Sequence, residues 1–350
     1  MNLTTKLFQR NRPSHISPVA SHGARVAILM RTKNRPILLA RAFASVLSQM
    51  HADWHLYLVN DGGDARVVDE LVERYARQFA GRMTVIHHEK SLGMEAASNA
   101  ALHRSTGDFI VVHDDDDSWH PDFLAATTSF LRNPANDHYA AALSHCTIIY
   151  ERIGIGCVIE ELRVDGFCPE QIDLGDMIQQ NRFPPISLLI RRSTVDVIGD
   201  YNENLPVLGD WDYNLRILFM GDIGVIPRKL AYYHHRRSVE QNAYGNTVIA
   251  GVARHELYIT LYRNSMLRHM VQTDPGRIAV IHILAKQASK NHEDLSRRLI
   301  QVEQVVIELR QIAAMVNQCL RPIRWGWRRL YPLRRIVAKI RGRVPWRGMA

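Results

Sequence analysis

The chain has 350 residues, 46% of them hydrophobic and 23% charged, and these proportions exclude a disordered, collagen-like or low-complexity protein. The formal net charge of +9 is concentrated in residues 321–350, which hold ten of the 44 Lys and Arg residues and no acidic residue. The remaining 320 residues carry 34 basic and 35 acidic side chains, and this near-neutral charge argues against a protein that binds nucleic acid through its body.

Cysteine content and hydropathy indicate the compartment. The cysteines are few and scattered, at Cys146, Cys157, Cys168 and Cys319. Their spacing predicts neither a disulfide framework nor a zinc ribbon, and it fits a reducing environment. No stretch approaches the roughly 18 consecutive apolar residues of a membrane-spanning helix, and residues 1–25 lack the apolar centre of a secretory signal. We therefore expect a cytoplasmic protein without a transmembrane helix.

Short apolar runs alternate with amphipathic stretches after a polar, flexible lead-in over residues 1–23. The runs predict buried strands over residues 25–30, 54–59, 83–87 and 108–112. The stretches between them predict three helices: one begins at Pro36, and the other two span residues 67–79 and 93–102. Strands that alternate with helices of this length imply an α/β fold with a mainly parallel, doubly wound sheet.

Polar clusters follow three of the predicted strands. They occupy residues 32–35, 60–64 and 114–117. Ligands of doubly wound sheets bind beyond the carboxyl ends of the strands. We therefore expect the three clusters to converge on one edge of the sheet and to form the ligand site.

The middle of the chain is less regular, and its end is helical. Strands are predicted over residues 140–150, 154–159, 186–190 and 229–235, with a helix over residues 210–219. Two further helices are predicted over residues 249–270 and 276–290. These limits divide the chain into an α/β domain over residues 24–245, a helical region over 246–320 and a basic, aromatic tail over 321–350.

An apolar heptad repeat occupies residues 292–320. Its positions alternate by four and three residues, at Leu295, Leu299, Val302, Val306, Leu309, Ala313, Val316 and Leu320. This spacing is that of the a/d seam of a coiled coil, which would make the protein a homo-oligomer. The alternative is an amphipathic helix that packs on its own domain.

The tail over residues 321–350 combines its basic side chains with aromatic ones. The aromatic residues are Trp325, Trp327, Tyr331 and Trp346. Basic amphipathic segments bind anionic membrane surfaces, so the tail predicts peripheral attachment to the inner face of the cytoplasmic membrane. The alternatives are a solvated tail, a contact with the chain's own domain and a nucleic-acid contact, which we regard as the weakest of the three.

The run Asp114–Asp117 is the sharpest local signal. It directly follows the apolar residues 109–112 and precedes Trp119 and Pro121. An isolated acidic run is usually a solvated surface, but like charges at the end of a buried strand repel one another. A hard cation relieves this repulsion, and carboxylate oxygens suit Mg²⁺ or Mn²⁺. The run therefore predicts a divalent metal site.

The first 240 residues resemble a family 2 glycosyltransferase with the Rossmann-like GT-A fold. Four stretches carry the resemblance in the family's order, at Arg31–Arg35, Val59–Asp64, Asp114–Asp122 and Gly209–Arg216. The third resembles the DXD metal motif with its Trp-x-Pro-Asp sequel, and the fourth resembles the motif that carries the catalytic base. Gly93 and Asn99 fit a family segment that lies between the second and third stretches.

The resemblance implies a nucleotide-sugar site. Its residues would be Thr32, Asn34, Arg35, Asp61, Gly93, Asn99, Asp114 and Asp115. Asp61 would contact the base, and its alternative is a turn former. Two positions depart from the family pattern, because Lys33 replaces a common Tyr and Ser98 replaces a common Arg. Both concern nucleotide recognition, so the nucleotide stays open.

The resemblance also implies Mn²⁺ or Mg²⁺ as cofactor. Asp116 would be the main ligand, with Asp114 and His235 beside it. His234 is the alternative to His235, and a histidine satisfied by its neighbours in a strand is the structural alternative to both. Asp117 is interpreted structurally, as a helix N-cap.

Catalysis is assigned to Asp210, which matches the family's general base and would deprotonate the acceptor hydroxyl. Trp211 and Asp212 would lie beside the acceptor, with simple packing as the alternative for Trp211. The resemblance implies a metal-dependent, inverting transfer of a sugar from a nucleotide-diphosphate sugar to a glycan or lipid-linked acceptor, in bacterial surface polysaccharide or lipopolysaccharide synthesis. The alternative is a non-catalytic assembly protein that acts through its coiled coil.

Overall fold

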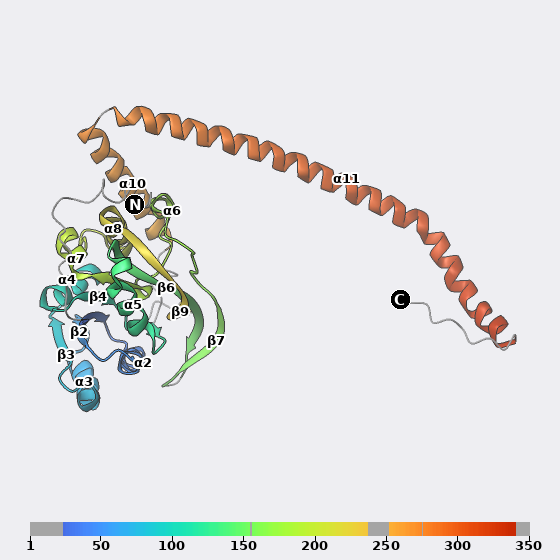
Figure 1. The fold of residues 1–350 in the computed structure, drawn as a ribbon. Helices are drawn as coiled ribbons and strands as arrows, with labels where there is room; N and C mark the ends of the chain where they lie inside the picture. Colours follow the sequence, from blue (N-terminus) through green and yellow to red (C-terminus); the bar gives the residue numbers. More distant parts are fainter. Residues whose placement is uncertain (1–23, 155, 237–251, 275, 341–350) are drawn as a thin grey trace. The chain divides into compact units, whose positions relative to one another are not determined.

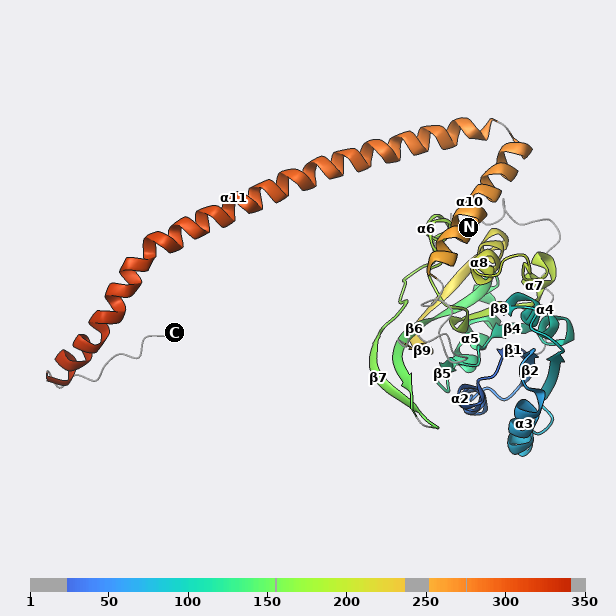
Figure 2. The ribbon, with the colours of Figure 1, turned by 180° about the vertical axis from the view of Figure 1, so that it is seen from behind.

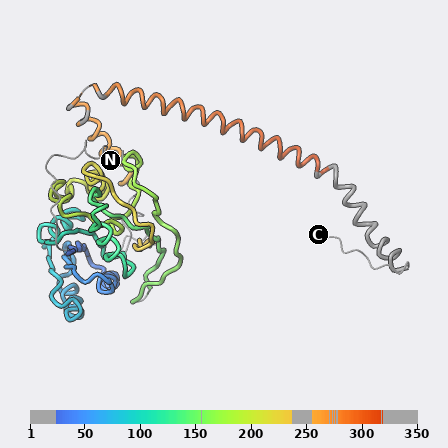
Figure 3. Tube along the Cα trace, in the orientation of Figure 1, coloured from blue at the N-terminus to red at the C-terminus, as the bar shows by residue number. Residues whose placement is uncertain are grey.

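The computed structural model describes residues 24–154, 156–236, 252–274 and 276–340 (Figures 1 and 3). The predicted lead-in over residues 1–23 lies outside the described residues, as does the end of the predicted α/β domain at residues 237–245. The chain divides into two compact units, residues 1–263 and residues 264–350.

The first half of the α/β unit follows the predicted alternation of strands and helices. Its elements are β1 (Val26–Thr32), α2 (Pro36–Leu47), β2 (Trp54–Asp61), α3 (Ala65–Phe79), β3 (Met83–His88), α4 (Met94–Arg104) and β4 (Phe109–Val112). The four strands pair in parallel in the order β3-β2-β1-β4. The predicted α/β fold with a parallel sheet is thus confirmed for this half.

The second half continues the same sheet with mixed strand directions. Its elements are β5 (Ser118–Trp119), α5 (Phe123–Arg132), η1 (Pro134–Asn136), β6 (Tyr139–Ile153), β7 (Val158–Asp165), α6 (Leu174–Gln179), η2 (Pro185–Ser187), β8 (Leu188–Arg191), α7 (Arg192–Ile198), α8 (Gly209–Met220) and β9 (Asp222–Arg236). β8 is antiparallel to both β4 and β6, whereas β6 and β9 run parallel along most of their length (Figure 2). The predicted strands overlap β6, β8 and β9 and the predicted helix overlaps α8, but the strand predicted over residues 154–159 shares only residues 158–159 with β7, and β5, α5, α6 and α7 were not predicted.

Helices cover both faces of the sheet. Val26, Ile28 and Met30 of β1 pack with apolar side chains of α2, α3 and α5, whereas Ala27 and Leu29 pack with those of α4, α7 and α8. Successive side chains of a strand point to opposite faces, so a strand buried on both faces is apolar throughout. The doubly wound arrangement therefore follows from the uninterrupted apolar sequence of β1.

A close backbone approach fixes the turn after β2 against the segment before α4. Gly62 has a φ of +69°, and a Cβ atom at this position would lie 2.2 Å from the backbone nitrogen of Ser91. Only glycine fits such a contact and adopts this conformation without strain. Asp64 then caps α3 by accepting a hydrogen bond from the nitrogen of Arg66 at 3.0 Å. This turn holds the carboxyl end of β2 beside the start of α4.

α10 (Val252–Thr273) begins in the first unit, which ends at residue 263 rather than at the predicted limit of 245. Contacts of the first unit explain the later limit. The Tyr262 hydroxyl donates to Asp212 at 2.9 Å, and the Arg263 guanidinium donates to the carbonyl of Gln179. This part of α10 therefore packs on the α/β domain.

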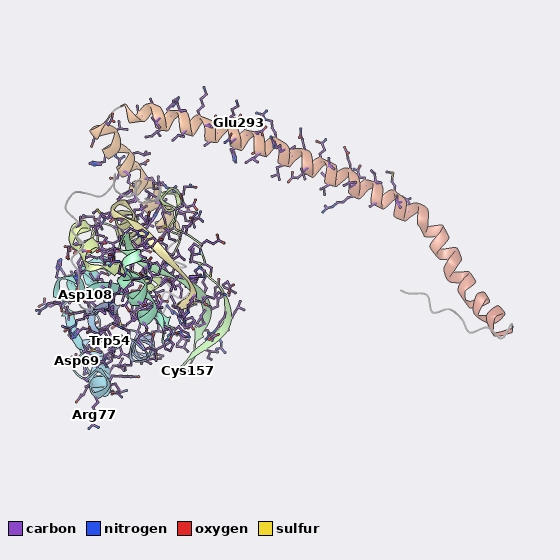
Figure 4. The ribbon with its side chains drawn as sticks, in the orientation of Figure 1. Trp54, Asp69, Arg77, Asp108, Cys157 and Glu293 are labelled. Carbon is purple, nitrogen blue, oxygen red and sulfur yellow. The ribbon has the colours of Figure 1, made fainter. Side chains whose placement is uncertain are left out.

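The second unit is dominated by α11 (Arg277–Ile340), one helix of 64 residues. It includes the predicted helix over residues 276–290, the heptad segment and residues 321–340 of the predicted tail. The apolar heptad side chains of the described part are exposed by 40 to 64%, at Leu295, Leu299, Val302, Val306, Leu309 and Val316. Figure 4 labels Glu293 on α11, two residues before the first apolar heptad position, Leu295. Ile300, Val305, Ile307, Ile312 and Met315 of the same helix are exposed as well, so exposure does not single out the heptad positions and the coiled coil stays a prediction.

Two further sequence expectations concern the whole chain. Among the described helices, none is both long enough and apolar enough to cross a membrane. The thiols of Cys146, Cys157 and Cys168 are free, with Cys146 buried and Cys157 exposed at the turn between β6 and β7 (Figure 4). Residues 341–350 lie outside the described residues, so the membrane prediction for the tail stays a prediction.

Candidate functional site

A cavity of about 770 Å³ lies beyond the carboxyl ends of β1, β2 and β4. The first turns of α4 and α8 and part of β9 complete its wall. Side chains from all three predicted polar clusters reach it, including Thr32, Asp61 and Asp114–Asp117. The convergence expected from the strand order is therefore present, because the carboxyl ends of parallel strands meet at one edge.

Arginines neutralise the acidic run on one side of this cavity. Arg31 donates to Asp114 Oδ1 through Nε at 2.9 Å and Nη2 at 2.5 Å. Asp116 Oδ2 accepts from Arg35 Nη1 at 3.1 Å and from Arg236 Nη2. Arg236 is only 1% exposed. The repulsion expected within the acidic run is thus offset by guanidinium groups of the chain itself.

The two central aspartates of the run differ in protonation. Burial raises the pKa of Asp115 to about 7; the charge of Arg35 opposes this shift and that of Asp116 adds to it. The Asp115 carboxyl accepts a hydrogen bond from the Thr32 hydroxyl at 2.7 Å. Burial also disfavours the charge on Asp116, but Arg236 and Arg35 hold its pKa below the ordinary range. Of these two aspartates, Asp116 is therefore the one held ionised.

The buried carboxylate of Glu151 pairs with the basic residues next to the acidic run. Glu151 of β6 lies 2.6 Å from Arg41 Nη1, 2.7 Å from His234 Nδ1 and 3.0 Å from Arg236 Nη1. Burial opposes ionisation of Glu151, but the hydrogen bonds from His234 and Arg41 lower its pKa to about 2. Arg236 thus bridges Glu151 and Asp116 and joins β9 and β6 to the acidic run.

His234 and Asp117 are parts of this support. The two ring nitrogens of His234 face Glu151 at 2.7 Å and the Ser118 hydroxyl at 2.8 Å. The backbone nitrogen of His234 donates to Asp117 at 2.9 Å. A strand, β5, follows Asp117, so the interpretation of Asp117 as a helix N-cap is wrong. His234 is instead the strand histidine satisfied by its neighbours.

The donor atoms fit a metal ion only in part. Asp114 and Asp116 line the cavity, and in the described part of the chain each has one carboxylate oxygen without a hydrogen bond. His235 does not line the cavity; its ring lies against those of Tyr150 and Tyr233. No group of three or more His, Cys, Asp or Glu side chains among the described residues is arranged to hold a metal. The site therefore fits a cation that takes two carboxylates and completes its shell with phosphate oxygens.

Asp61 is fully occupied by protein donors. Its carboxylate accepts from His88 at 2.9 Å, from the Ser91 hydroxyl at 2.6 Å, and from the backbone nitrogens of Leu92 at 2.8 Å and Gly93 at 3.1 Å. Burial raises its pKa, but these hydrogen bonds outweigh burial and lower it. A carboxylate has about four acceptor positions, so Asp61 orders the loop before α4 rather than offering a free acceptor.

The remaining residues of the first polar cluster are divided between two cavities. Thr32 and Arg35 line both the main cavity and a neighbouring one of about 160 Å³. Asn34 lines only the smaller one, has a φ of +57° and accepts a hydrogen bond from the nitrogen of Asp64 at 3.0 Å. Lys33 lines the main cavity and is exposed. Asn34 therefore shapes the turn, whereas its neighbours face the site.

Asn99 lies outside the cavity lining, which differs from its predicted role. It is 3% exposed and forms hydrogen bonds with the carbonyl and the nitrogen of Tyr201 at 3.0 and 2.8 Å and with Glu203 at 2.8 Å. Tyr201 and Glu203 both line the cavity. Asn99 therefore braces a wall of the site. Ser98, also buried, accepts a hydrogen bond from Arg31 at 3.2 Å.

Asp210 occupies the first turn of α8 and lines the cavity. Its carboxylate accepts from Asn181 Nδ2 at 2.8 Å and from the backbone nitrogen of Trp211 at 2.8 Å. Burial raises the pKa of Asp210; the charge of Asp114 adds to this shift and that of Arg31 opposes it. A buried carboxyl with a raised pKa is suited to accept a proton near neutral pH.

The predicted acceptor-side residues do not line the cavity. Trp211 is 2% exposed, and its indole nitrogen donates to the carbonyl of Met177 at 2.6 Å. Asp212 pairs with Arg216 at 2.8 Å and accepts from the Tyr262 hydroxyl. On a helix, successive side chains point in different directions, so Asp210, Tyr213 and Asn214 of this motif line the cavity whereas Trp211 and Asp212 do not. Trp211 packs in the core, as its alternative reading expected.

Several site residues were not assigned from the sequence. Arg236, Arg41 and Glu151 form the buried support, and Glu95 lines the cavity beside α8. Arg236 meets Asp116 across 120 positions of sequence, a separation that no local pattern encodes. Arg31 directly precedes Thr32 at the end of β1, and that position alone could have identified it.

Comparisons with known proteins find similarity to glycosyltransferases. Residues 27–148 match the model of the family Glycosyl transferase family 2. EpsE of Bacillus subtilis (strain 168), which carries a glycosyltransferase name, is 25% identical over 184 residues, covering 52% of this chain and 61% of its own length. A PGL/p-HBAD biosynthesis glycosyltransferase of Mycobacterium tuberculosis (strain ATCC 25177 / H37Ra) is 25% identical over 64% of this chain and 80% of its own length. The crystal structure of S. aureus TarS residues 1–349 is 17% identical, with a TM-score of 0.49 and 60% of each chain covered.

Proposed function

This chain belongs to glycosyl transferase family 2 through residues 27–148, and we propose on that premise that it transfers a sugar from a nucleoside-diphosphate sugar to a hydroxyl group. One observation carries the proposal. A single cavity holds both an arginine-bound acidic cluster and a separate buried carboxyl, Asp210, with a raised pKa. These are the two chemical functions that the transfer requires, namely a site for the diphosphate and a base for the acceptor.

The acidic side of the cavity would receive the diphosphate. Arg31 and Arg35 fix the orientation of Asp114 and Asp116, so that one oxygen of each carboxylate stays available to a cation. A bound Mn²⁺ or Mg²⁺ would supply Lewis-acid stabilisation of the charge on the leaving diphosphate. Arg35 and Lys33 line the same cavity and add positive charge near the anion. We therefore propose a divalent cation held by Asp114 and Asp116, without His235.

The opposite side would activate the acceptor. Asp210 would accept the proton of the attacking hydroxyl while Asn181 holds its other oxygen in place. The oxygen of the acceptor attacks the anomeric carbon as the bond to the diphosphate breaks. We propose a direct displacement that inverts the anomeric configuration, because Asp210 would act as a base and not as a nucleophile.

The acceptor is proposed to be a glycan or a lipid-linked glycan of a bacterial surface. The name of the mycobacterial relative supports this class, since it refers to PGL and p-HBAD biosynthesis. A peripheral position on the inner face of the cytoplasmic membrane would bring such an acceptor within reach. The ten Lys and Arg side chains of the segment 321–350 support this membrane location, because they are attracted to anionic lipids.

The exposed seam of α11 supports a homo-oligomer built by a second copy of this helix. With Leu299 and Val306 at a positions, Arg298 falls at g and Glu303 at the following e position. In a parallel coiled coil these two charges of opposite sign face each other across the interface. Light scattering of the full chain tests this, and Val306→Asp should convert the oligomer to monomers. An unchanged mass for this variant would contradict the seam.

Thermal stability against UDP, GDP, dTDP and CDP, each with and without Mn²⁺, tests the proposed function. A ligand that binds only the folded state raises the melting temperature, by mass action. We expect one nucleotide to raise it in the presence of Mn²⁺ and the Asp116→Asn variant to lose that increase. No increase with any nucleotide would favour the alternative, an assembly protein that acts through α11.

A further inference from the structure

A second carboxyl group, that of Glu95, lies in the cavity and has no role in the mechanism so far. Glu95 belongs to the first turn of α4, lines the same cavity as Asp210 and is 6% exposed. Within the part of the chain that the structure describes, no other residue donates a hydrogen bond to its side chain. A carboxyl that lines a cavity and receives no hydrogen bond from another residue can accept one from a ligand that enters that cavity.

The position of Glu95 depends on a glycine at the start of α8. A Cβ atom at Gly209 would lie 2.1 Å from Glu95 Oε1, 2.5 Å from its Cγ and 2.6 Å from its Cδ. No side chain at residue 209 is compatible with these distances. Gly209 directly precedes Asp210, so the Glu95 carboxyl packs against the same helical turn that carries the proposed base.

Three charged groups act on Glu95 inside the cavity. Burial raises the pKa of Glu95, Arg31 opposes the shift, and the carboxyls of Asp210 and Asp114 add to it. A neutral donor of hydrogen bonds, such as a hydroxyl, satisfies a carboxyl in this environment without adding further charge.

We propose that Glu95 accepts a hydrogen bond from a sugar hydroxyl beside the reaction centre and so determines which sugar is used. The proposal rests on the proposed transfer reaction and adds a specificity residue to it. The hydroxyl belongs either to the transferred sugar or to the acceptor sugar, since both meet at Asp210. A site built to pair with a hydroxyl rejects the analogue that lacks it, because the buried acceptor then stays unpaired.

Binding measurements distinguish the two sources. The probes are UDP, GDP and dTDP with their glucose, galactose, mannose and N-acetylglucosamine conjugates, each with Mn²⁺. If Glu95 holds the transferred sugar, Glu95→Gln should weaken binding of the nucleotide sugar by about 10- to 150-fold and leave binding of the nucleoside diphosphate unchanged. If it holds the acceptor, both affinities stay unchanged and KM for p-nitrophenyl glycoside acceptors rises by the same factor.

Deoxy analogues separate recognition from structural damage. In the wild type, removal of the recognised hydroxyl should cost about 10- to 150-fold, whereas in Glu95→Gln, whose neutral amide oxygen accepts a weaker hydrogen bond, that penalty should be smaller. Gly209→Ala should reproduce the Glu95→Gln result by displacing the carboxyl. Gly221→Ala is the matched control, because an added Cβ there meets its nearest neighbour at an ordinary 3.4 Å. Glu73→Gln on the exposed side of α3 controls for the lost charge.

The outcomes distinguish a failure of this proposal from a failure of the proposed transfer reaction. Wild-type transfer with unaltered nucleotide-sugar affinity, acceptor KM and deoxy penalty in Glu95→Gln would overturn the role of Glu95 and leave the transferase intact. A wild type that binds no nucleotide and transfers no sugar would overturn both.

Discussion

The carboxyl groups on the two sides of the cavity differ in their ion pairing and in the direction of their pKa shifts. On one side Asp114 and Asp116 each pair with arginine, and the pKa of Asp116 lies below its ordinary value. On the other side Asp210 is held by an amide and a backbone nitrogen, Glu95 has no partner among the described residues, and both pKa values are raised. Asp116 is therefore held ionised by the arginines that pair with it, whereas Asp210, held by an amide and a backbone nitrogen, is suited to accept a proton.

This difference suggests a separate chemical role for each side of the cavity. A carboxylate paired with arginine suits a cation and an anionic leaving group, whereas a buried carboxyl with a raised pKa suits proton transfer. Arg31 lies between the two sides, because it donates to Asp114 and also to Ser98 and the carbonyl of Met94 at the start of α4. Variants that exchange the properties of the two sides therefore test the proposed mechanism.

The largest effect is expected for the proposed base. Asp210→Asn keeps the shape of the side chain but cannot accept the proton, so kcat should fall by about 10²–10⁴-fold. Affinity for the nucleoside diphosphate should stay unchanged, because that ligand would bind on the arginine-rich side. Asp53→Asn, an exposed position next to β2, serves as the matched control. A kcat for Asp210→Asn within threefold of wild type would contradict the assignment.

The buried support of the acidic side should carry a large stability effect. Glu151→Gln leaves the guanidinium of Arg236 buried beside a neutral amide, and loss of one partner of a buried ion pair costs about 3–5 kcal/mol of unfolding free energy. Urea denaturation measures this loss. Glu151→Asp keeps the charge and should lose less. Equal losses for the two variants would indicate a packing role rather than an electrostatic one.

The same residue predicts a sign for the pH dependence of stability. The pKa of Glu151 is about 2 in the folded protein, against an ordinary value of 4.5, so the unfolded state binds the proton first. Its contribution is therefore present above about pH 4.5 and lost as the pH falls through about 2. The fall in stability over that range should be smaller in Glu151→Gln than in the wild type.

The reactive side predicts the pH dependence of the rate. Because the pKa of Asp210 is raised above its ordinary value of 3.8, kcat should decline on the acid side at a pH above that value. Glu95 is close enough to contribute charge, so the limb reports the pair rather than one residue. Glu95→Gln removes a like charge and should shift the limb to lower pH. A limb at 3.8 in the wild type, or a shift to higher pH in the variant, would contradict this coupling.

The contrast between regions also explains what the sequence could predict. Mostly apolar runs alternate with helices from β1 to β4, so these parallel strands and the acidic edge at Asp114–Asp117 were predictable. α5 was missed because the buried hydroxyls of Thr127 and Thr128 donate to carbonyls one turn earlier, at 2.7 and 2.6 Å, which hides polar residues in its core-facing side. Local patterns reveal periodicity, but they do not reveal such pairing.

The site could be predicted only where a residue's direction follows from its element. Thr32 and Asp114 lie at strand ends and face the cavity as expected. Trp211 and Asp212 share a motif with Asp210, but the helix turns them toward the core and toward Tyr262. The partners of the acids, such as Arg236, come from distant segments, and a single sequence contains no signal for those contacts.

The smallest predicted effect concerns Asn99, for which motif and structure disagree. As a nucleotide ligand, Asn99 would be needed for affinity; as a brace for Tyr201 and Glu203, it would be needed for stability. Its buried amide pairs only with that loop, so Asn99→Ala should lower the unfolding free energy by about 1–3 kcal/mol. Affinity for the nucleoside diphosphate should change less than threefold, because Asn99 does not line the cavity. A tenfold loss of affinity at wild-type stability would restore the motif-based role and would show that the boundary of the donor site extends beyond this cavity.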